Sequence, residues 1–228
     1  FSDGKLFTRS KKRGDYNKAL QTLVFHGATP EILYEAHPHI GTDRLPRIIS
    51  NICNTITQSG GEIHFSSKVT GFELDASRTR IKGVWVGDNL IEGAAVVLAT
   101  GHSAKDIYHT LHRDGVRLEA KAFAMGVRIE HPQKLVDSIQ YRMPQRGEYL
   151  PAASYSLVNQ VDGRGVYSFC MCPGGYVVNA SSEQNRLVVN GMSNHDRESS
   201  CANSAIIVTV NENDYGSNKE LLQLMKRG

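Results

Sequence analysis

The chain has 228 residues and a formal net charge of +3, with 40% hydrophobic and 21% charged residues. These values are ordinary for a soluble globular protein, and the length allows a sizeable core in one domain or in one and a half. No apolar stretch of 18 residues and no signal-like N-terminus is present, so we expect no membrane partner. The basic cluster at residues 9–13 lacks interleaved aromatic residues, which favours a solvated loop over a nucleic-acid surface.

The cysteines and histidines give no pattern of a structural site. The spacing of the four cysteines fits neither a disulfide framework nor a zinc site, so a reducing cytoplasm is the expected compartment: Cys53, Cys170, Cys172 and Cys201. His37 and His39 would face the same side of a strand, but no third ligand is marked near them. We therefore expect no metal and read this segment as a loop before the central helix.

Two short helical segments follow an N-terminal loop. Residues 1–13 are polar, basic and glycine-containing, which indicates a loop. Residues 15–25 carry apolar side chains at helical spacing, and Gly27 ends that helix. Pro30 then opens a further helical turn.

The central helix begins after residues 41–43, and its apolar residues recur on one face: Leu45, Ile48, Ile49, Ile52 and Ile56. Thr42 or Asp43 can cap its first amides, and Pro46 near the start favours Asp43. Gly60 and Gly61 predict its end, because glycine tolerates the left-handed conformation at a helix C-terminus.

An antiparallel meander is predicted after this helix. A short strand at residues 62–66 precedes strands at 69–75, 80–87 and 90–92, which are joined by turn residues. Residues 94–99 are apolar throughout and suit a strand covered on both faces, as in a parallel sheet. This strand would end at Thr100 and Gly101.

The second half of the chain is rich in predicted strands. A helix starts near Ser103, and the remaining segments are strands at 116–118, 122–130, 155–158, 165–172, 176–179, 186–190 and 205–210, with helices at 132–141 and 217–227. The polar run from Asn190 to Asn203 is predicted to be a long loop. Arg197 in this loop is a candidate ligand for a substrate carboxylate.

Cys170 and Cys172 allow two interpretations. On a regular strand both thiols face the same side, so a redox pair is conceivable. A disulfide between such close residues would be strained, and nothing nearby in the sequence marks a lowered thiol pKa. Buried apolar cysteines are therefore the favoured interpretation.

Five phrases resemble a family of uncharacterised bacterial FAD-dependent dehydrogenases of the two-dinucleotide-binding flavoprotein type. They occur in the family's order, at residues 1–6 (FSDGKL), 36–42 (AHPHIGT), 99–104 (ATGHSA), 151–155 (PAASY) and 167–175 (YSFCMCPGG). The resemblance implies an α/β fold with an added strand-rich α+β part. It implies a partial FAD-binding Rossmann-like domain at 1–117 with a helix, a meander and a buried parallel strand. An inserted antiparallel substrate domain at 118–212 and a terminal helix at 213–228 would follow.

The resemblance also implies that the chain is an internal fragment. The sequence contains no G-x-G-x-x-G, so the family's N-terminal glycine loop would precede Phe1, and its last flavin-contacting segment would follow Gly228. The fragment alone is expected to bind FAD weakly or not at all. Apolar surface left without neighbours would favour self-association.

The implied cofactor contacts come from four regions: Ser2, Asp3, Gly4, Lys5, Val69, Thr100, Gly101, Pro173, Gly174 and Gly175. In such flavoproteins the backbone at the start of the meander, here Val69, pairs with adenine. Lys5 would place positive charge near the flavin or a phosphate. The competing readings are a surface loop at residues 1–13 and an ordinary strand-to-helix turn at Thr100 and Gly101.

The expected function is therefore that of an internal segment of an FAD-dependent oxidoreductase with an unknown substrate. NAD(P)H is a candidate electron donor, and no catalytic residue can be assigned; His102 lies beside the implied cofactor edge without a clear role. The alternatives are a non-redox nucleotide or metabolite binder and a structural or interaction domain on the same scaffold.

Overall fold

The computed structural model describes residues 3–7, 14–101, 103–182, 184–211 and 214. The chain forms two compact units, one from the described residues of 1–61 and 121–228 and the other from residues 62–120. This division places the first 61 residues with the second half of the chain, whereas the resemblance grouped them with the meander. The domain scheme expected for a longer protein stays a prediction.

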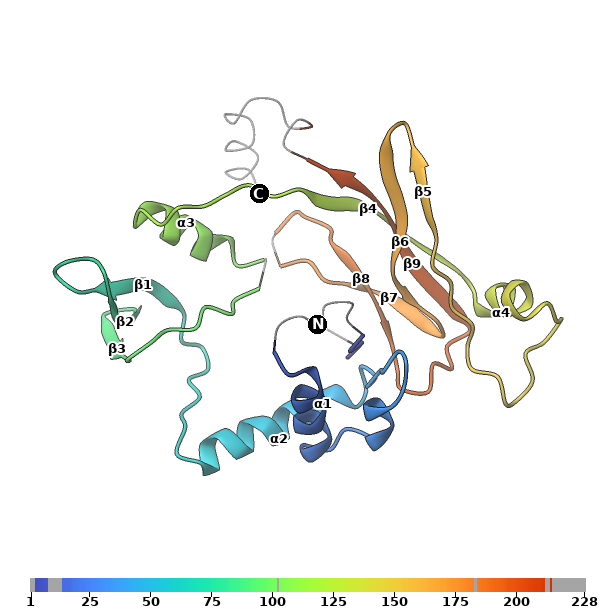
Figure 1. The fold of residues 1–228 in the computed structure, drawn as a ribbon, viewed down its shortest axis with the longest axis horizontal. Coiled ribbons are helices and arrows are strands. Elements are labelled where there is room, and N and C mark those ends of the chain that lie inside the picture. Colours follow the sequence, from blue (N-terminus) through green and yellow to red (C-terminus); the bar gives the residue numbers. More distant parts are fainter. Residues whose placement is uncertain (1–2, 8–13, 102, 183, 212–213, 215–228) are drawn as a thin grey trace. The chain divides into compact units, whose positions relative to one another are not determined.

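The first unit contains most of the helices and strands (Figure 1). In chain order they are α1 (Tyr16–Phe25), η1 (Pro30–Leu33), α2 (Leu45–Gln58), β4 (Phe123–Pro132), α4 (Gln133–Tyr141), β5 (Val158–Val161), β6 (Arg164–Cys172), β7 (Gly175–Asn179), β8 (Val189–Ser193) and β9 (Cys201–Val210). The second unit contains β1 (Val69–Leu74), β2 (Ile81–Val86), β3 (Asn89–Glu92) and α3 (Lys105–Arg113). The predicted helices at 15–25, 30–33 and 132–141 are confirmed, while the predicted helix at 217–227 lies outside the described residues.

Every strand pairing in the described chain is antiparallel. In the first unit the strand order is β4-β9-β6-β5, and the β7–β8 hairpin packs against β4, β6 and β9. The second unit holds the three-stranded sheet β1-β2-β3, so the predicted meander is confirmed. The fold is thus mixed α and β with antiparallel sheets, as expected for the strand-rich part.

The apolar run at 94–99 differs from its prediction. Residues 93–100 form no strand, and the side chains of Val97 and Leu98 are 89% and 46% exposed. A parallel strand needs hydrogen-bonding neighbours, and none of the described strands pairs with this run. The expectation of a buried parallel strand is therefore wrong for this structure, as are the strands expected at 62–66 and 116–118.

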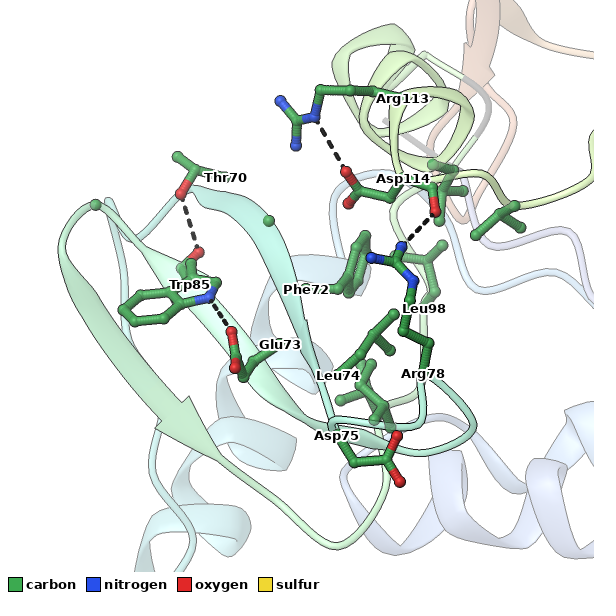
Figure 2. Close-up of a pocket in the computed structure, with 16 residues that line it drawn as sticks. Thr70, Phe72, Glu73, Leu74, Asp75, Arg78, Trp85, Leu98, Arg113 and Asp114 are labelled. Atoms are coloured by element: carbon green, nitrogen blue, oxygen red, sulfur yellow. Dashed lines mark hydrogen bonds and ion pairs between the residues drawn. The ribbon is translucent and has the colours of Figure 1, made fainter.

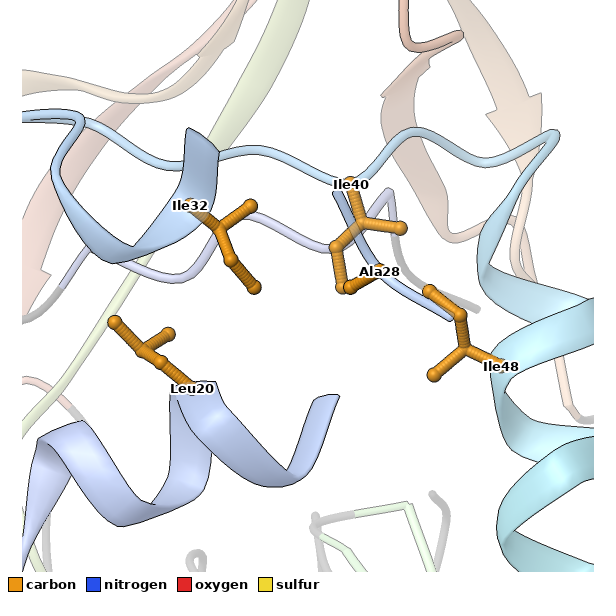
Figure 3. Close-up of a cluster of buried hydrophobic side chains, with 5 residues drawn as sticks. All are labelled: Leu20, Ala28, Ile32, Ile40 and Ile48. Carbon is orange, nitrogen blue, oxygen red and sulfur yellow. The ribbon is translucent and has the colours of Figure 1, made fainter. Parts of the chain in front are cut away.

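The helices of the first unit enclose a small apolar core. Its five buried side chains come from α1, η1, α2 and the segments between them: Leu20, Ala28, Ile32, Ile40 and Ile48. Figure 3 shows them converging from these separate elements. The core therefore fixes the segment around Ile40 against α1 and α2, which matters because this segment borders the site described below.

Helix α2 starts differently from its prediction and ends as predicted. Its N-cap is Arg44, and the Asp43 carboxylate accepts a hydrogen bond from the backbone N–H of His195 at 2.8 Å, so the predicted Asp43 cap is wrong. At the other end Gly60 has φ +84° and donates to Thr57 O. Gly61 donates to Ile56 O, which completes a Schellman motif.

Replacing Gly60 by alanine is expected to destabilise the protein by about 1 kcal/mol, because a side chain disfavours the left-handed backbone. A Cβ at this position would meet nothing within 4 Å, so no steric clash adds to that cost. Urea unfolding followed by circular dichroism measures the effect. Ser59→Ala is the matched control, since Ser59 has a negative φ of −87°. Equal stability of the Gly60→Ala and Ser59→Ala variants would contradict a left-handed backbone at Gly60.

One face of β4 carries an exposed apolar row. Phe123, Met125, Val127 and Ile129 alternate along the strand and are each at least 41% exposed. Self-association through such a surface stays a prediction. In the described part of the chain, no helix combines the length and the apolar character needed to cross a bilayer.

Candidate functional site

Strand β6 ends in a bulge that carries both thiols of the Cys170–Cys172 phrase. The pairing with β9 runs from Val166 to Phe169 and then resumes only at Cys172, opposite Asn203. Cys170 lies between these points with φ +49°, a left-handed conformation that costs a residue with a side chain about 1–2 kcal/mol. Bulges of this kind redirect side chains and occur often beside functional sites.

Buried polar contacts hold this bulge in place. Arg128, on β4, donates from Nη1 to Cys170 O at 3.2 Å and to Asn203 Oδ1 at 2.6 Å. Cys172 and Asn203 are fully buried. The arginine therefore ties the irregular backbone of β6 to the adjacent strand β9 and to β4 beyond it.

The N-terminal segment lies beside the bulge because it pairs with residues 38–41. Leu6 N donates to Pro38 O at 3.0 Å, and Ile40 N donates to Gly4 O at 3.0 Å. Gly4 has φ +71°, and the side chains of Asp3 and Lys5 on either side of it meet in an ion pair. A Cβ on Gly4 would lie 2.7 Å from Ile40 Cβ, which explains the glycine.

Lys5 contacts both thiols. Its Nζ lies 2.9 Å from Cys172 Sγ and 3.7 Å from Cys170 Sγ, and it forms an ion pair with Asp3. The Asp3 carboxylate also accepts from Ser193 Oγ at 3.3 Å and lies 3.7 Å from His39 Nε2. We call these side chains the lysine–thiol cluster: Asp3, Lys5, His39, Cys170, Cys172 and Ser193.

The cluster shifts the pKa values of its members. Burial opposes ionisation of Asp3, but the hydrogen bond with His39 and the charge of Lys5 outweigh it and hold its pKa well below the usual range. Burial of Lys5 would lower the pKa of its ammonium group. The sulfur of Cys172 and the carboxylate of Asp3 outweigh this effect and raise that pKa. Asp3 and Lys5 therefore stay charged at neutral pH.

The two thiols ionise as a pair. The hydrogen bond from Cys172 and then the charge of Lys5 lower the pKa of Cys170 to about 5. The same hydrogen bond, together with burial, raises the pKa of Cys172. Lys5 Nζ lies beside both sulfurs and is the closer to Cys172, so its positive charge favours ionisation of the pair. The interpretation as buried apolar cysteines is therefore wrong, since a cationic partner lies beside both.

Two buried donors near the cluster have no hydrogen-bond acceptor among the described residues. They are Arg197 Nε and Asn203 Nδ2. Burial lowers the pKa of Arg197, while Asp3, Glu35 and Cys172 oppose that shift, so the guanidinium lies within the electrostatic reach of the cluster. Donors in this state suit a ligand that brings acceptor atoms.

The turn after Cys172 is packed against the chain itself. Gly174 N donates to Gln133 Oε1 at 2.7 Å, and a Cβ on Gly174 would collide with the backbone carbonyl of Arg197. A Cβ on Gly175 would collide with Met192 O. These glycines are therefore required by internal packing, which is a different reason from the close cofactor approach expected from the sequence.

The predicted site residues fall into two groups. Asp3, Gly4, Lys5 and the turn of Pro173, Gly174 and Gly175 belong to the first unit, where Lys5 contacts Cys172 immediately before that turn. Val69, Thr100 and Gly101 belong to the second unit. Ser2 and His102 lie outside the described residues. Their roles as cofactor contacts stay predictions.

The second unit contains its own cavity of about 700 Å³. Figure 2 shows apolar side chains of β1, including Phe72 and Leu74, facing Leu98 across this cavity. Arg78 closes one side by donating from Nη2 to Asp114 O at 3.1 Å. Thr70 lines the cavity next to Val69, the predicted adenine contact, but Thr100 and Gly101 do not line it.

Several members of the lysine–thiol cluster were not predicted from the sequence. His39 and Ser193 of the cluster were missed, and so were Arg128 and Asn203 beside the bulge, because each comes from a different segment of the chain. A usable signal existed, since Lys5 and the two cysteines lie in two of the phrases that carry the family resemblance. In the ranges that the structure describes, no three histidine, cysteine or acidic side chains are grouped so as to hold a metal ion.

The comparisons with known proteins support an FAD-dependent family. Residues 122–227 match the family model described as "FAD-dependent protein, C-terminal domain-like". An uncharacterized protein of Clostridium beijerinckii is 46% identical over 223 residues, which are 97% of this chain and 41% of that protein. The chain thus spans less than half the length of this relative. The matched region contains the β4–β9 sheet and both thiols of the cluster.

Proposed function

We propose that this chain is part of an FAD-dependent oxidoreductase in which the lysine–thiol cluster lies at the flavin. One observation carries the proposal: two phrases of the family resemblance, more than 160 residues apart, meet where Lys5 contacts Cys170 and Cys172. The family match of residues 122–227 supports the FAD-dependent assignment.

The residues present fit a flavin. Its ring carries several acceptor atoms, and the buried Arg197 Nε and Asn203 Nδ2 have no acceptor among the described residues. FAD would supply the hydride chemistry when bound. Lys5 would supply a fixed positive charge, and Asp3 would hold the lysine in place through their ion pair.

The second unit would serve the adenosine half of the cofactor. We propose that Val69 pairs with adenine and that Thr100 and Gly101 approach the pyrophosphate. We also propose that NAD(P)H is the electron donor and that the protein is cytoplasmic.

A second candidate function is a nucleotide or metabolite binder without redox activity. It is favoured by the cavity of about 700 Å³ in the second unit, which combines apolar walls with polar groups at its rim. An interaction module without a ligand is the third possibility.

The absorbance of the intact protein tests the proposal. After purification and denaturation, the released cofactor is expected to absorb at about 450 nm, as free flavin does. Lys5→Met in the intact protein is expected to weaken FAD retention, because it removes the charge beside the bulge. Lys18→Met is the control, since Lys18 is exposed on α1. A colourless protein that FAD cannot reconstitute would favour the non-redox binder.

A further inference from the structure

We propose that Cys170 and Cys172 are a redox-active dithiol that reacts with disulfides, in which Cys170 attacks and Cys172 resolves. This chemistry goes beyond the proposed flavin function and does not require FAD. It rests on the placement of two thiols, one lysine and one carboxylate at the bulge of β6.

The different exposure of the two sulfurs assigns their roles. Cys170 is half-buried at the bulge, whereas Cys172 is fully buried. An external disulfide can therefore reach Cys170 first, and Cys172 can act only from inside the protein. Both cysteines are unpaired, and Cys172 Sγ lies 3.3 Å from Cys170 O, so the second thiol is next to the residue that it must attack.

The charged groups around the pair favour a thiolate. Lys5 approaches from the N-terminal segment, Arg128 from β4 and Arg197 from the loop before β9. Asp3 is the acidic group beside them, and it is paired with Lys5; His39 lies on its far side, against Ser193. Nearby positive charge stabilises a thiolate over a thiol, and the thiolate is the nucleophile in exchange reactions.

The bulge also changes the geometry on which the sequence argued against a disulfide between Cys170 and Cys172. On a regular strand two cysteines at positions i and i+2 would form a strained disulfide. Here the backbone at Cys170 is left-handed and the ladder with β9 is interrupted, so the two side chains are not held at regular strand spacing.

The reaction balances in two exchange steps. The Cys170 thiolate attacks one sulfur of a disulfide R–S–S–R, forms the Cys170–S–S–R bond and releases RS⁻. Cys172 then loses its proton to solvent and attacks the Cys170 sulfur. This step forms the Cys170–Cys172 disulfide and releases a second RS⁻. The dithiol is oxidised by two electrons, and the substrate disulfide is reduced to two thiolates.

The first arm of the test measures thiol reactivity against pH. The intact protein is alkylated with iodoacetamide, and mass spectrometry follows the Cys170 peptide. The midpoint of the rate is expected to lie well below that of an ordinary thiol, because the hydrogen bond from Cys172 and the charge of Lys5 lower the pKa of Cys170. Lys5→Met is expected to move that midpoint upward and to slow alkylation at pH 7 by about tenfold or more.

Two further variants separate the effect of the Lys5 charge from a structural effect of the substitution. Lys5→Arg retains the positive charge and is expected to keep the low midpoint, which a merely structural role of the lysine would not predict. Lys18→Met, on the exposed face of α1, is expected to change nothing. A Cys170 midpoint in the range of an ordinary thiol, unchanged by Lys5→Met, would overturn the proposal.

The second arm measures turnover of a disulfide. In a Cys53→Ser, Cys201→Ser background, 4,4′-dithiodipyridine is expected to release two thiopyridone equivalents per chain and leave a Cys170–Cys172 disulfide. Adding Cys172→Ser is expected to stop the reaction at one equivalent, with a mixed disulfide on Cys170. Two mixed disulfides on the background protein, with no internal bond, would refute the resolving role.

The two proposals fail separately. Loss of the flavin band in a protein that still forms the internal disulfide would reject only the proposed function. A flavin-containing protein with two unreactive thiols would reject only the dithiol.

Discussion

Replacing Gly174 by alanine is expected to destabilise the protein by about 2 to 5 kcal/mol, combining a left-handed backbone with steric overpacking. Gly174 has φ +51°, and a Cβ there would collide with the carbonyl group of Arg197, which is backbone and cannot rotate away. The loop before β9 must therefore move. This also breaks the hydrogen bonds of Gly174 N to Gln133 and of Ser199 N to Gly174 O.

Chemical denaturation measures the loss of stability, and hydrogen exchange at the Gly174 and Ser199 amides localises it. Gly163→Ala is the matched control, because Gly163 also has a positive φ, of +76°, in a turn between strands of the same sheet. A Cβ there would meet nothing within 4 Å, so we expect only the backbone cost of about 1 to 2 kcal/mol. Equal losses in the two variants would show that the contact with Arg197 is not tight.

Replacing Ile48 by alanine is expected to cost about 2 to 5 kcal/mol, the range found when large buried side chains are truncated. Ile48 is 2% exposed and belongs to the core formed by α1, η1 and α2 (Figure 3). The cavity left behind also loosens Ile40, which lies next to His39 of the lysine–thiol cluster. Lower protection of the Ile40 and Gly41 amides, which donate to Gly4 O and Asp3 O, should therefore accompany the loss in hydrogen exchange.

Ile49→Ala supplies the control one residue away on the same helix. Ile49 is 49% exposed, so its truncation is expected to change the free energy of unfolding by less than about 1 kcal/mol. The difference between the two variants measures burial, since both make the same change in one helix. Similar losses at both positions would contradict the observed orientation of α2.

Local patterns were sufficient for the elements whose side chains and turns carry their own information. The periodicity of α2, the Gly60–Gly61 stop and the turns of the meander each depend on neighbours in sequence, and all three are present. The failed strand at 94–99 shows the limit of this reasoning. Its apolar run indicates burial between neighbours, but a strand forms only where partners supply hydrogen bonds, and the described residues supply none.

The candidate site was predicted only in part. Asp3, Gly4 and Lys5 and the Pro173–Gly175 turn were singled out from the sequence, and the structure places Lys5 against Cys172, the residue before that turn. The thiols were judged to be buried apolar cysteines, because no charged residue lies near them along the chain. Lys5 is 167 positions from Cys172, and no local pattern predicts a contact over that separation.

The sequence by itself therefore determined where helices, turns and most strands form, because turn residues, glycines and side-chain periodicity act over a few residues. The tertiary structure alone decided the chemistry at β6. A bulge interrupts the ladder at Cys170, and the pairing of residues 3–6 with 38–41 carries Lys5 to the thiols. An ionised thiol depends on charges a few ångströms away in space, and only the folded chain brings those charges together.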